Sequence, residues 1–89
     1  MKAVITVHGK DSTGIIAKVS RLLSECNINI DDITQTTENG RFLMVMLVNM
    51  ENMTVTFAKI SEMLAELGKS INQKIVIRHE GLFNSMHRI

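Results

Sequence analysis

The chain has 89 residues, of which 45% are hydrophobic and 21% are charged, and ten basic residues against nine acidic ones leave a net charge of +1. These values predict one ordinary globular domain, residues 1–89, with 80–89 as a C-terminal tail. They argue against electrostatic binding to nucleic acid or to an anionic membrane, and no apolar run is long enough for a membrane span or a signal peptide. The single cysteine excludes an internal disulfide and favours a reducing cytoplasm.

A strand and a helix are predicted first along the chain. Residues 2–8 are β-branched and apolar, with every second residue in one phase, which is typical of a strand. The polar stretch 9–14 then breaks the pattern. The helix that follows ends at Asn27, because asparagine tolerates a left-handed cap. Its apolar face carries Ile15, Val19, Leu22, Leu23 and Cys26.

Two strands joined by a tight hairpin are predicted next. Ile28 and Ile30 open the first of them, and a change of apolar phase at Asp31-Asp32 predicts a bulge. Asn39-Gly40 is the strongest short-range hairpin signal in the chain. The run 42–48 is continuously apolar, which predicts a strand covered on both faces. We expect its main core residues to be Phe42, Met44, Met46, Val48 and Met50.

A second helix, a last strand and the tail complete the chain. The helix is predicted to start near Thr54, with Gly68 as the left-handed residue just after its end. Residues 70–78 form the last strand. The helix buries Phe57, Ile60, Met63, Leu64 and Leu67, and the tail gathers Leu82, Phe83 and Met86 on one helical turn.

The order β-α-β-β-α-β predicts an α+β, ferredoxin-like fold. In this arrangement a four-stranded antiparallel sheet has its first and third strands in the centre, both helices on one face and, here, a short C-terminal tail. The other face of the sheet needs a cover over Leu43, Val45 and Leu47, which the tail or a second subunit could provide.

The junction of the first strand and first helix is the candidate site. A helix N-terminus offers amide N–H groups to a carboxylate, Gly14 allows close approach, and Asp11 could accept a hydrogen bond from an ammonium group. Together they fit the head group of a free amino acid. The alternative is that Asp11 or Ser12 simply caps the helix, as most such residues do.

Catalytic and metal-binding patterns are missing from the sequence. The histidines and the cysteine (His8, Cys26, His79 and His87) lack the paired spacing of a zinc site, so no metal and no cofactor is expected. Asp31 and Asp32 point to opposite faces of a strand, which argues against a shared catalytic role. The chain also lacks the sequence motifs of hydrolases, P-loop proteins and dinucleotide-binding enzymes, and we predict that it is not an enzyme.

The element order, the loop Asp11-Ser12-Thr13-Gly14-Ile15 and the segment Cys26-Asn27-Ile28-Asn29-Ile30 resemble the ACT domain, a small regulatory module of amino-acid metabolism. The tail resembles that of small stand-alone bacterial members. The resemblance implies that an amino acid lies between two subunits, against Asp11, Ser12, Thr13, Gly14 and Ile15 of one and Asn29 of the other. Thr13 stands where members often have proline. From its position alone, Asn29 could equally be a surface residue of an edge strand.

The second strand is predicted to lie at the edge of the sheet, rich in threonine and without blocking charges after Asp32. Such an edge invites a second copy, and a two-fold axis would make one eight-stranded sheet that brings Asn29 toward Asp11 and Gly14 of the other chain. The leading hypothesis is a cytoplasmic homodimeric sensor that binds a small amino acid and modulates a partner protein. The alternative is an adaptor that uses the tail and the apolar sheet face and has no small-molecule ligand.

Overall fold

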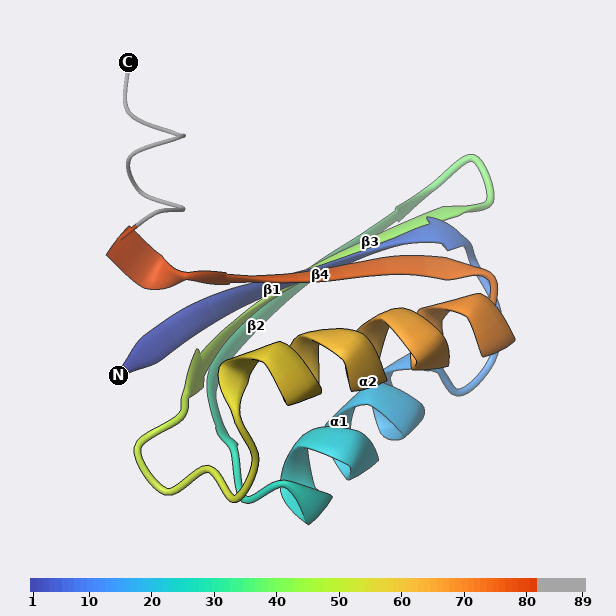
Figure 1. Ribbon diagram of the computed structural model, residues 1–89. Coiled ribbons are helices and arrows are strands. Elements are labelled where there is room, and N and C mark those ends of the chain that lie inside the picture. Colours follow the sequence, from blue (N-terminus) through green and yellow to red (C-terminus); the bar gives the residue numbers. More distant parts are fainter. Residues whose placement is uncertain (82–89) are drawn as a thin grey trace.

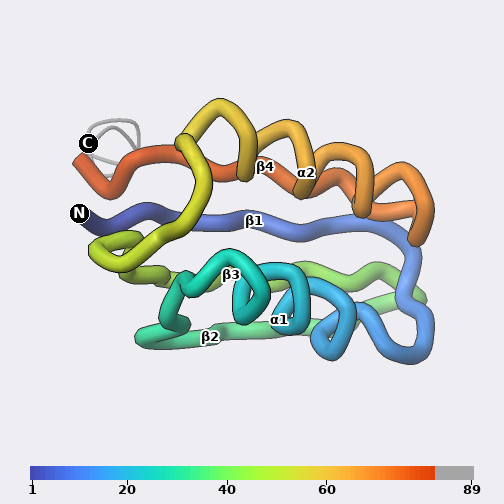
Figure 2. Tube along the Cα trace, turned by 60° about the horizontal axis from the view of Figure 1, so that its bottom comes forward, coloured from blue at the N-terminus to red at the C-terminus, as the bar shows by residue number. Residues whose placement is uncertain are grey.

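The computed structural model describes residues 1–81 and has the predicted ferredoxin-like architecture (Figure 1). The elements are β1 (Lys2–Lys10), α1 (Ile15–Glu25), β2 (Asn29–Glu38), β3 (Arg41–Asn49), α2 (Phe57–Ser70) and β4 (Gln73–His79). The four strands are antiparallel in the order β2-β3-β1-β4, so β1 and β3 are central, as predicted. Both helices lie on one face of the sheet, α2 over the β4 side and α1 over the β2–β3 side (Figure 2).

The core lies between the helices and the sheet. Every second residue of β3 faces it, and the predicted set Phe42, Met44, Met46, Val48 and Met50 is buried. The helices contribute Val19, Leu23, Ile60 and Leu64, each fully buried. On the opposite face of the sheet, Leu43 is 47% exposed, which confirms that this face is only partly covered within the described residues. The predicted tail cluster of Leu82, Phe83 and Met86 lies outside the described residues.

The turns agree with the sequence. Asn39 (φ 54°) and Gly40 (φ 76°) both adopt positive φ, the geometry of a type I′ hairpin. The register of β2 and β3 shifts between Ile30 and Asp32, so the predicted bulge is confirmed and Asp31 is its extra residue. Asn27 (φ 58°) follows α1 in the left-handed conformation expected of a helix terminator.

Three predictions about the ends of the helices are wrong. The N-cap of α1 is Gly14, with no capping side chain, so capping by Asp11 or Ser12 was a wrong expectation. Helix α2 begins at Phe57 rather than near Thr54, because Thr56 Oγ1 accepts a hydrogen bond from Lys59 N at 3.1 Å.

Gly68 lies inside α2 rather than after it, since the helix continues to Ser70. A Cβ at this position would collide with the main-chain oxygen of Gln73, so the glycine allows α2 to approach β4 closely. The last strand starts at Gln73 rather than at residue 70, after Asn72 turns the chain with φ 57°.

Candidate ligand-binding site

The loop before α1 leaves the first turn of the helix without a side-chain cap. Asp11, Ser12, Thr13 and Gly14 are exposed, and Ile15 is buried in the core. The first intrahelical hydrogen bond runs from Lys18 N to Gly14 O at 3.0 Å. The three preceding main-chain N–H groups therefore have no partner inside the helix, and within the described residues no side chain caps them. This end of α1 can donate hydrogen bonds to a carboxylate, and the helix dipole favours one.

The backbone explains why the loop has this shape. Asp11 N donates to Gly40 O at 2.8 Å, which fastens the loop to the β2–β3 hairpin. Gly14 has φ 85°, a left-handed conformation that costs glycine little and other residues more. Asp11 is thus tied by its main chain to the sheet, three residues before the helix cap.

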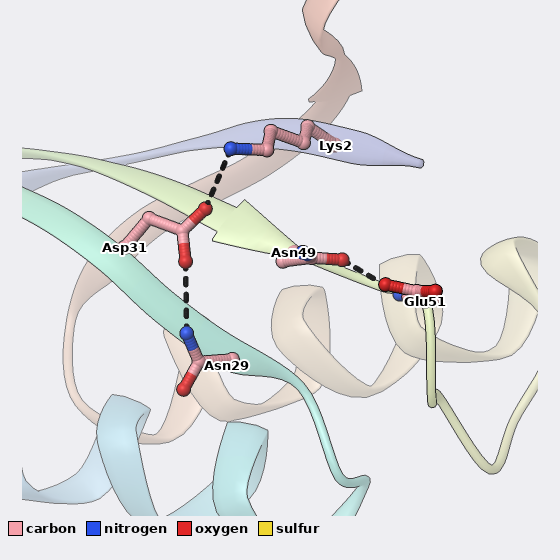
Figure 3. A network of polar contacts seen from close by, with 5 residues as sticks. All are labelled: Lys2, Asn29, Asp31, Asn49 and Glu51. Carbon is pink, nitrogen blue, oxygen red and sulfur yellow. Dashed lines mark hydrogen bonds and ion pairs between the residues drawn. The ribbon is translucent and has the colours of Figure 1, made fainter.

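Asn29 begins β2 at the opposite end of the sheet and belongs to a polar network (Figure 3). Its Nδ2 donates to Asp31 Oδ1 at 2.8 Å, and Lys2 Nζ lies 3.0 Å from Asp31 Oδ2. The hydrogen bonds from Lys2 and Asn29 lower the pKa of Asp31. The same contact with Asp31 raises the pKa of Lys2. At neutral pH the network therefore contains a carboxylate and an ammonium group.

A polar groove of about 730 Å³ surrounds Asn29. Two hydrogen bonds shape its wall, from Asn27 Nδ2 to Asn52 O at 3.0 Å and from Glu51 N to Asn49 Oδ1 at 2.9 Å. Most of these residues carry no signal in the sequence, although counting outward from the Asn39-Gly40 hairpin across one bulge pairs Asn29 with Asn49. The lining residues are Ser20, Ser24, Asn27, Ile28, Asn29, Ile30, Asn49, Glu51 and Asn52.

Within one chain, Asn29 and the loop before α1 are far apart. Asn29 pairs with Asn49, and Asn49 pairs with Lys2 at the start of β1, whereas the loop follows Lys10 at the end of β1. Eight steps of about 3.4 Å separate these ends of β1, or roughly 27 Å. Figure 1 shows the hairpin and the β1–α1 loop at one end of the sheet, and the C-terminal end of α1 at the other. One copy therefore brings Asp11, Ser12, Thr13, Gly14 and Ile15 together and leaves Asn29 apart.

Other kinds of site find little support in the part of the chain that the structure describes. Over residues 1–81, no cluster of three or more His, Cys, Asp or Glu side chains could hold a metal ion. Cys26 is buried in the core. None of the helices in this range has both the length and the apolar character needed to span a bilayer.

Comparison with known families identifies the fold. The family model of the ACT domain matches residues 2–78. The chain belongs to the ACT domain family. A UPF0237 protein of Clostridium acetobutylicum is 49% identical over 89 residues, covering 100% of both chains. A UPF0237 protein of the archaeon Methanocaldococcus jannaschii is 41% identical over 88 residues, covering 99% of this chain and 98% of the other. The relatives are thus archaeal as well as bacterial, which broadens the bacterial group suggested by the sequence.

Solved structures have the same fold. An ACT domain protein from Streptococcus pneumoniae is 38% identical, with a TM-score of 0.82 and coverage of 93% of both chains. The ligand-free regulatory subunit of aspartate kinase from Thermus thermophilus is 30% identical, with a TM-score of 0.67, covering 86% of this chain and 50% of the other. The ACT domain is a regulatory domain that binds small molecules.

Proposed function

We propose that this ACT domain is a non-enzymatic cytoplasmic sensor, in which two copies bind a free amino acid between them and thereby modulate a partner protein of amino-acid metabolism. The observation that carries the proposal is the uncapped N-terminus of α1. Its N–H groups take the ligand carboxylate, and the exposed Asp11 carboxylate accepts a hydrogen bond from the ligand ammonium. Gly14 keeps the approach to the helix open, and Asn29 of the second copy closes the site.

Antiparallel pairing of β2 with β2 of a second copy, here called the seam, would bring the two parts of the site together. When a strand pairs antiparallel with itself about a two-fold axis, its first residue lies beside the last residue of the other copy. For β2 this places Asn29 beside Glu38 of the partner subunit. Glu38 lies two residues before Gly40, whose main-chain oxygen binds Asp11. The pairing therefore carries Asn29 of one copy toward the loop before α1 of the other.

The edge of β2 supports such a seam. All of its residues except Ile30 are exposed, and from Ile33 to Thr37 its side chains carry no charge. Ile33, at the middle of the strand, is 38% exposed, so a large apolar side chain lies at this edge. A second copy would cover Ile33 and satisfy the unpaired main-chain groups of the edge.

The affinity expected of this site sets the conditions of the test. An amino acid of about seven non-hydrogen atoms, at roughly 0.7 kcal/mol each, gains about 5 kcal/mol on binding. This corresponds to a Kd on the order of tenths of a millimolar. Binding that excludes the unfolded state raises the Tm, so a screen needs millimolar ligand.

The test is a panel of the proteinogenic amino acids at 10 mM, followed by calorimetry on each that raises the Tm. We expect at least one to bind the wild type with Kd below about 1 mM, and Asn29→Ala to weaken it about tenfold or more. Asn52→Ala is the matched control, because it removes another exposed asparagine of the same groove. If no amino acid shifts the Tm, or both variants weaken binding equally, the proposed site is wrong.

A second candidate is a protein-binding adaptor, favoured by the 47% exposure of Leu43 on the open face of the sheet. In this case the open face and residues 80–89 would bind a partner protein without any small molecule. Deleting residues 80–89 would abolish capture of that partner, whereas Asp11→Ala and Asn29→Ala would leave it unchanged.

A further inference from the structure

The start of β2 holds one side chain in a defined orientation. Asp31 is the extra residue of the bulge and has no partner across the ladder in β3. Its carboxylate therefore reaches along its own strand to Asn29 and across the sheet to Lys2, and its side chain is 24% exposed. The bulge thus turns an exposed strand end into an ordered polar network (Figure 3).

Asp31 decides which atom of the Asn29 amide faces it. A carboxylate accepts hydrogen bonds and donates none, so the group 2.8 Å from Asp31 Oδ1 must be the Asn29 NH₂. Lys2 reinforces this choice, because its ammonium at 3.0 Å from Oδ2 keeps Asp31 ionised. Figure 3 shows the Asn29 Oδ1 on the side of the amide away from Asp31.

An amide held in this way keeps one of its two N–H groups on Asp31 and turns its oxygen away from that carboxylate. Asn29 lines the groove, so a hydrogen-bond donor can reach this oxygen, and the Asp31 carboxylate behind it favours a positively charged donor. A carboxylate placed there would face the Asn29 oxygen and, behind it, the Asp31 carboxylate, which is unfavourable. If the amide were turned over, its NH₂ would instead favour a carboxylate.

From this geometry we infer that Asp31, supported by Lys2, is a positioning residue that makes Asn29 select a primary ammonium group. The inference rests on the proposed function and names the ligand end that each copy recognises. The N-terminus of α1 in one copy binds the carboxylate, and Asn29 of the other copy binds the ammonium that Asp11 also contacts. The site therefore takes amino acids with a free amino group and rejects those whose amino group is acylated.

The test compares the variant Asp31→Asn with the control variant Asp32→Asn. Asp32 is the neighbouring residue, has the same charge as Asp31 and lies outside the Lys2–Asp31–Asn29 network. The probes are the amino acids that bind the wild type in the panel and the N-acetyl derivative of each, which keeps the carboxylate and lacks the ammonium. We expect Asp31→Asn to raise the Kd about three- to tenfold, Asp32→Asn to leave it within about twofold, and the N-acetyl derivatives not to bind. The side-chain NH₂ signals of Asn29 in ¹⁵N NMR spectra should shift in Asp31→Asn alone.

Each other outcome has a defined meaning. Equal Kd values for Asp31→Asn and the wild type, or binding of the N-acetyl derivatives, would overturn the inference while the sensor proposal stands. If no amino acid binds the wild type, the sensor proposal fails and the inference fails with it. Unchanged Asn29 signals in Asp31→Asn would show that Asp31 does not orient the amide, whatever binds. A normal Tm for both variants excludes misfolding as the cause.

Discussion

The two edge strands of the sheet are completed differently. Along β4, buried residues alternate with partly or fully exposed ones, α2 packs against the strand, and Gly68 lets the two main chains approach. The ring of Phe57 at the start of α2 stacks on His79 at the end of β4, with centroids 4.2 Å apart and planes 13° from parallel. Along β2, every residue except Ile30 is exposed, although α1 lies over the β2–β3 side of the sheet.

This difference shows where a small domain can accept a second copy. Strand β4 packs against α2, so its buried side chains contribute to folding. Within residues 1–81, the β2 edge leaves main-chain groups unpaired and the apolar side chain of Ile33 in contact with solvent. A partner strand would form hydrogen bonds with these main-chain groups and cover Ile33. The candidate ligand residues lie near the two ends of β2, Asn29 at its start and the loop before α1 beside the β2–β3 hairpin.

The largest effect on folding is expected where α2 packs against β4. Gly68→Ala would place a Cβ against the Gln73 main-chain oxygen and push α2 away from β4. Overpacking of this kind costs about 1–3 kcal/mol and should lower the Tm by at least about 5 °C. Thermal unfolding by circular dichroism measures it.

Gly81→Ala is the control for this substitution, because a Cβ at Gly81 meets no atom of the described part of the chain within 4 Å. Its Tm should match that of the wild type. A Gly68→Ala protein that is as stable as the wild type would show that α2 does not contact β4 this closely, and the contrast between the edges would be lost.

The fold was predictable because local patterns agreed with one another. The two-residue alternation of β3 and the helical spacing of α1 identified the buried faces, and Asn39-Gly40 fixed the hairpin. The position of Gly68 inside α2 was not predictable in the same way. It depends on a close approach to the main chain of Gln73 that only the folded chain creates.

One part of the candidate site was likewise predictable from the sequence and the other part was not. The loop from Asp11 to Ile15 is continuous in sequence and could be recognised as a helix N-terminus. The groove around Asn29 is assembled from α1, β2 and the segment after β3, so it required the cross-strand register and its bulge. The link between Lys2 and Asp31 crosses from β1 to β2 and has no signature in the sequence.

A charge placed on the open β2 edge is expected to change the oligomeric mass of the protein and to leave its fold intact. Ile33→Lys places a charge at the middle of β2, where the two-fold axis of the proposed dimer passes, and should convert a dimer into a folded monomer at micromolar concentration. Leu43→Lys makes the same chemical change on the open face of the sheet and should leave the dimer intact. Light scattering coupled to size-exclusion chromatography gives both masses. If Leu43→Lys dissociates the dimer and Ile33→Lys does not, the copies meet through the open face. A monomeric wild type would show that β2 does not pair with a second copy.

The smallest effect concerns the Lys2–Asp31 pair at the start of the open edge, and its sign follows from the two pKa shifts. Because folding lowers the pKa of Asp31, the pair stabilises the fold above the ordinary aspartate value of about 3.9, and this stabilisation is lost as the pH falls through the lower value of the folded state. Because folding raises the pKa of Lys2, helped also by the negative charge of Glu80, the contribution of Lys2 is present below about 10.4 and is lost as the pH rises through its higher folded value. The Tm difference between wild type and Asp31→Asn should therefore be small, constant between about pH 5 and 9, and absent in strong acid and in 1 M salt, which screens exposed charges. A difference that persists below pH 2 would mean that Asp31 acts through its shape rather than its charge.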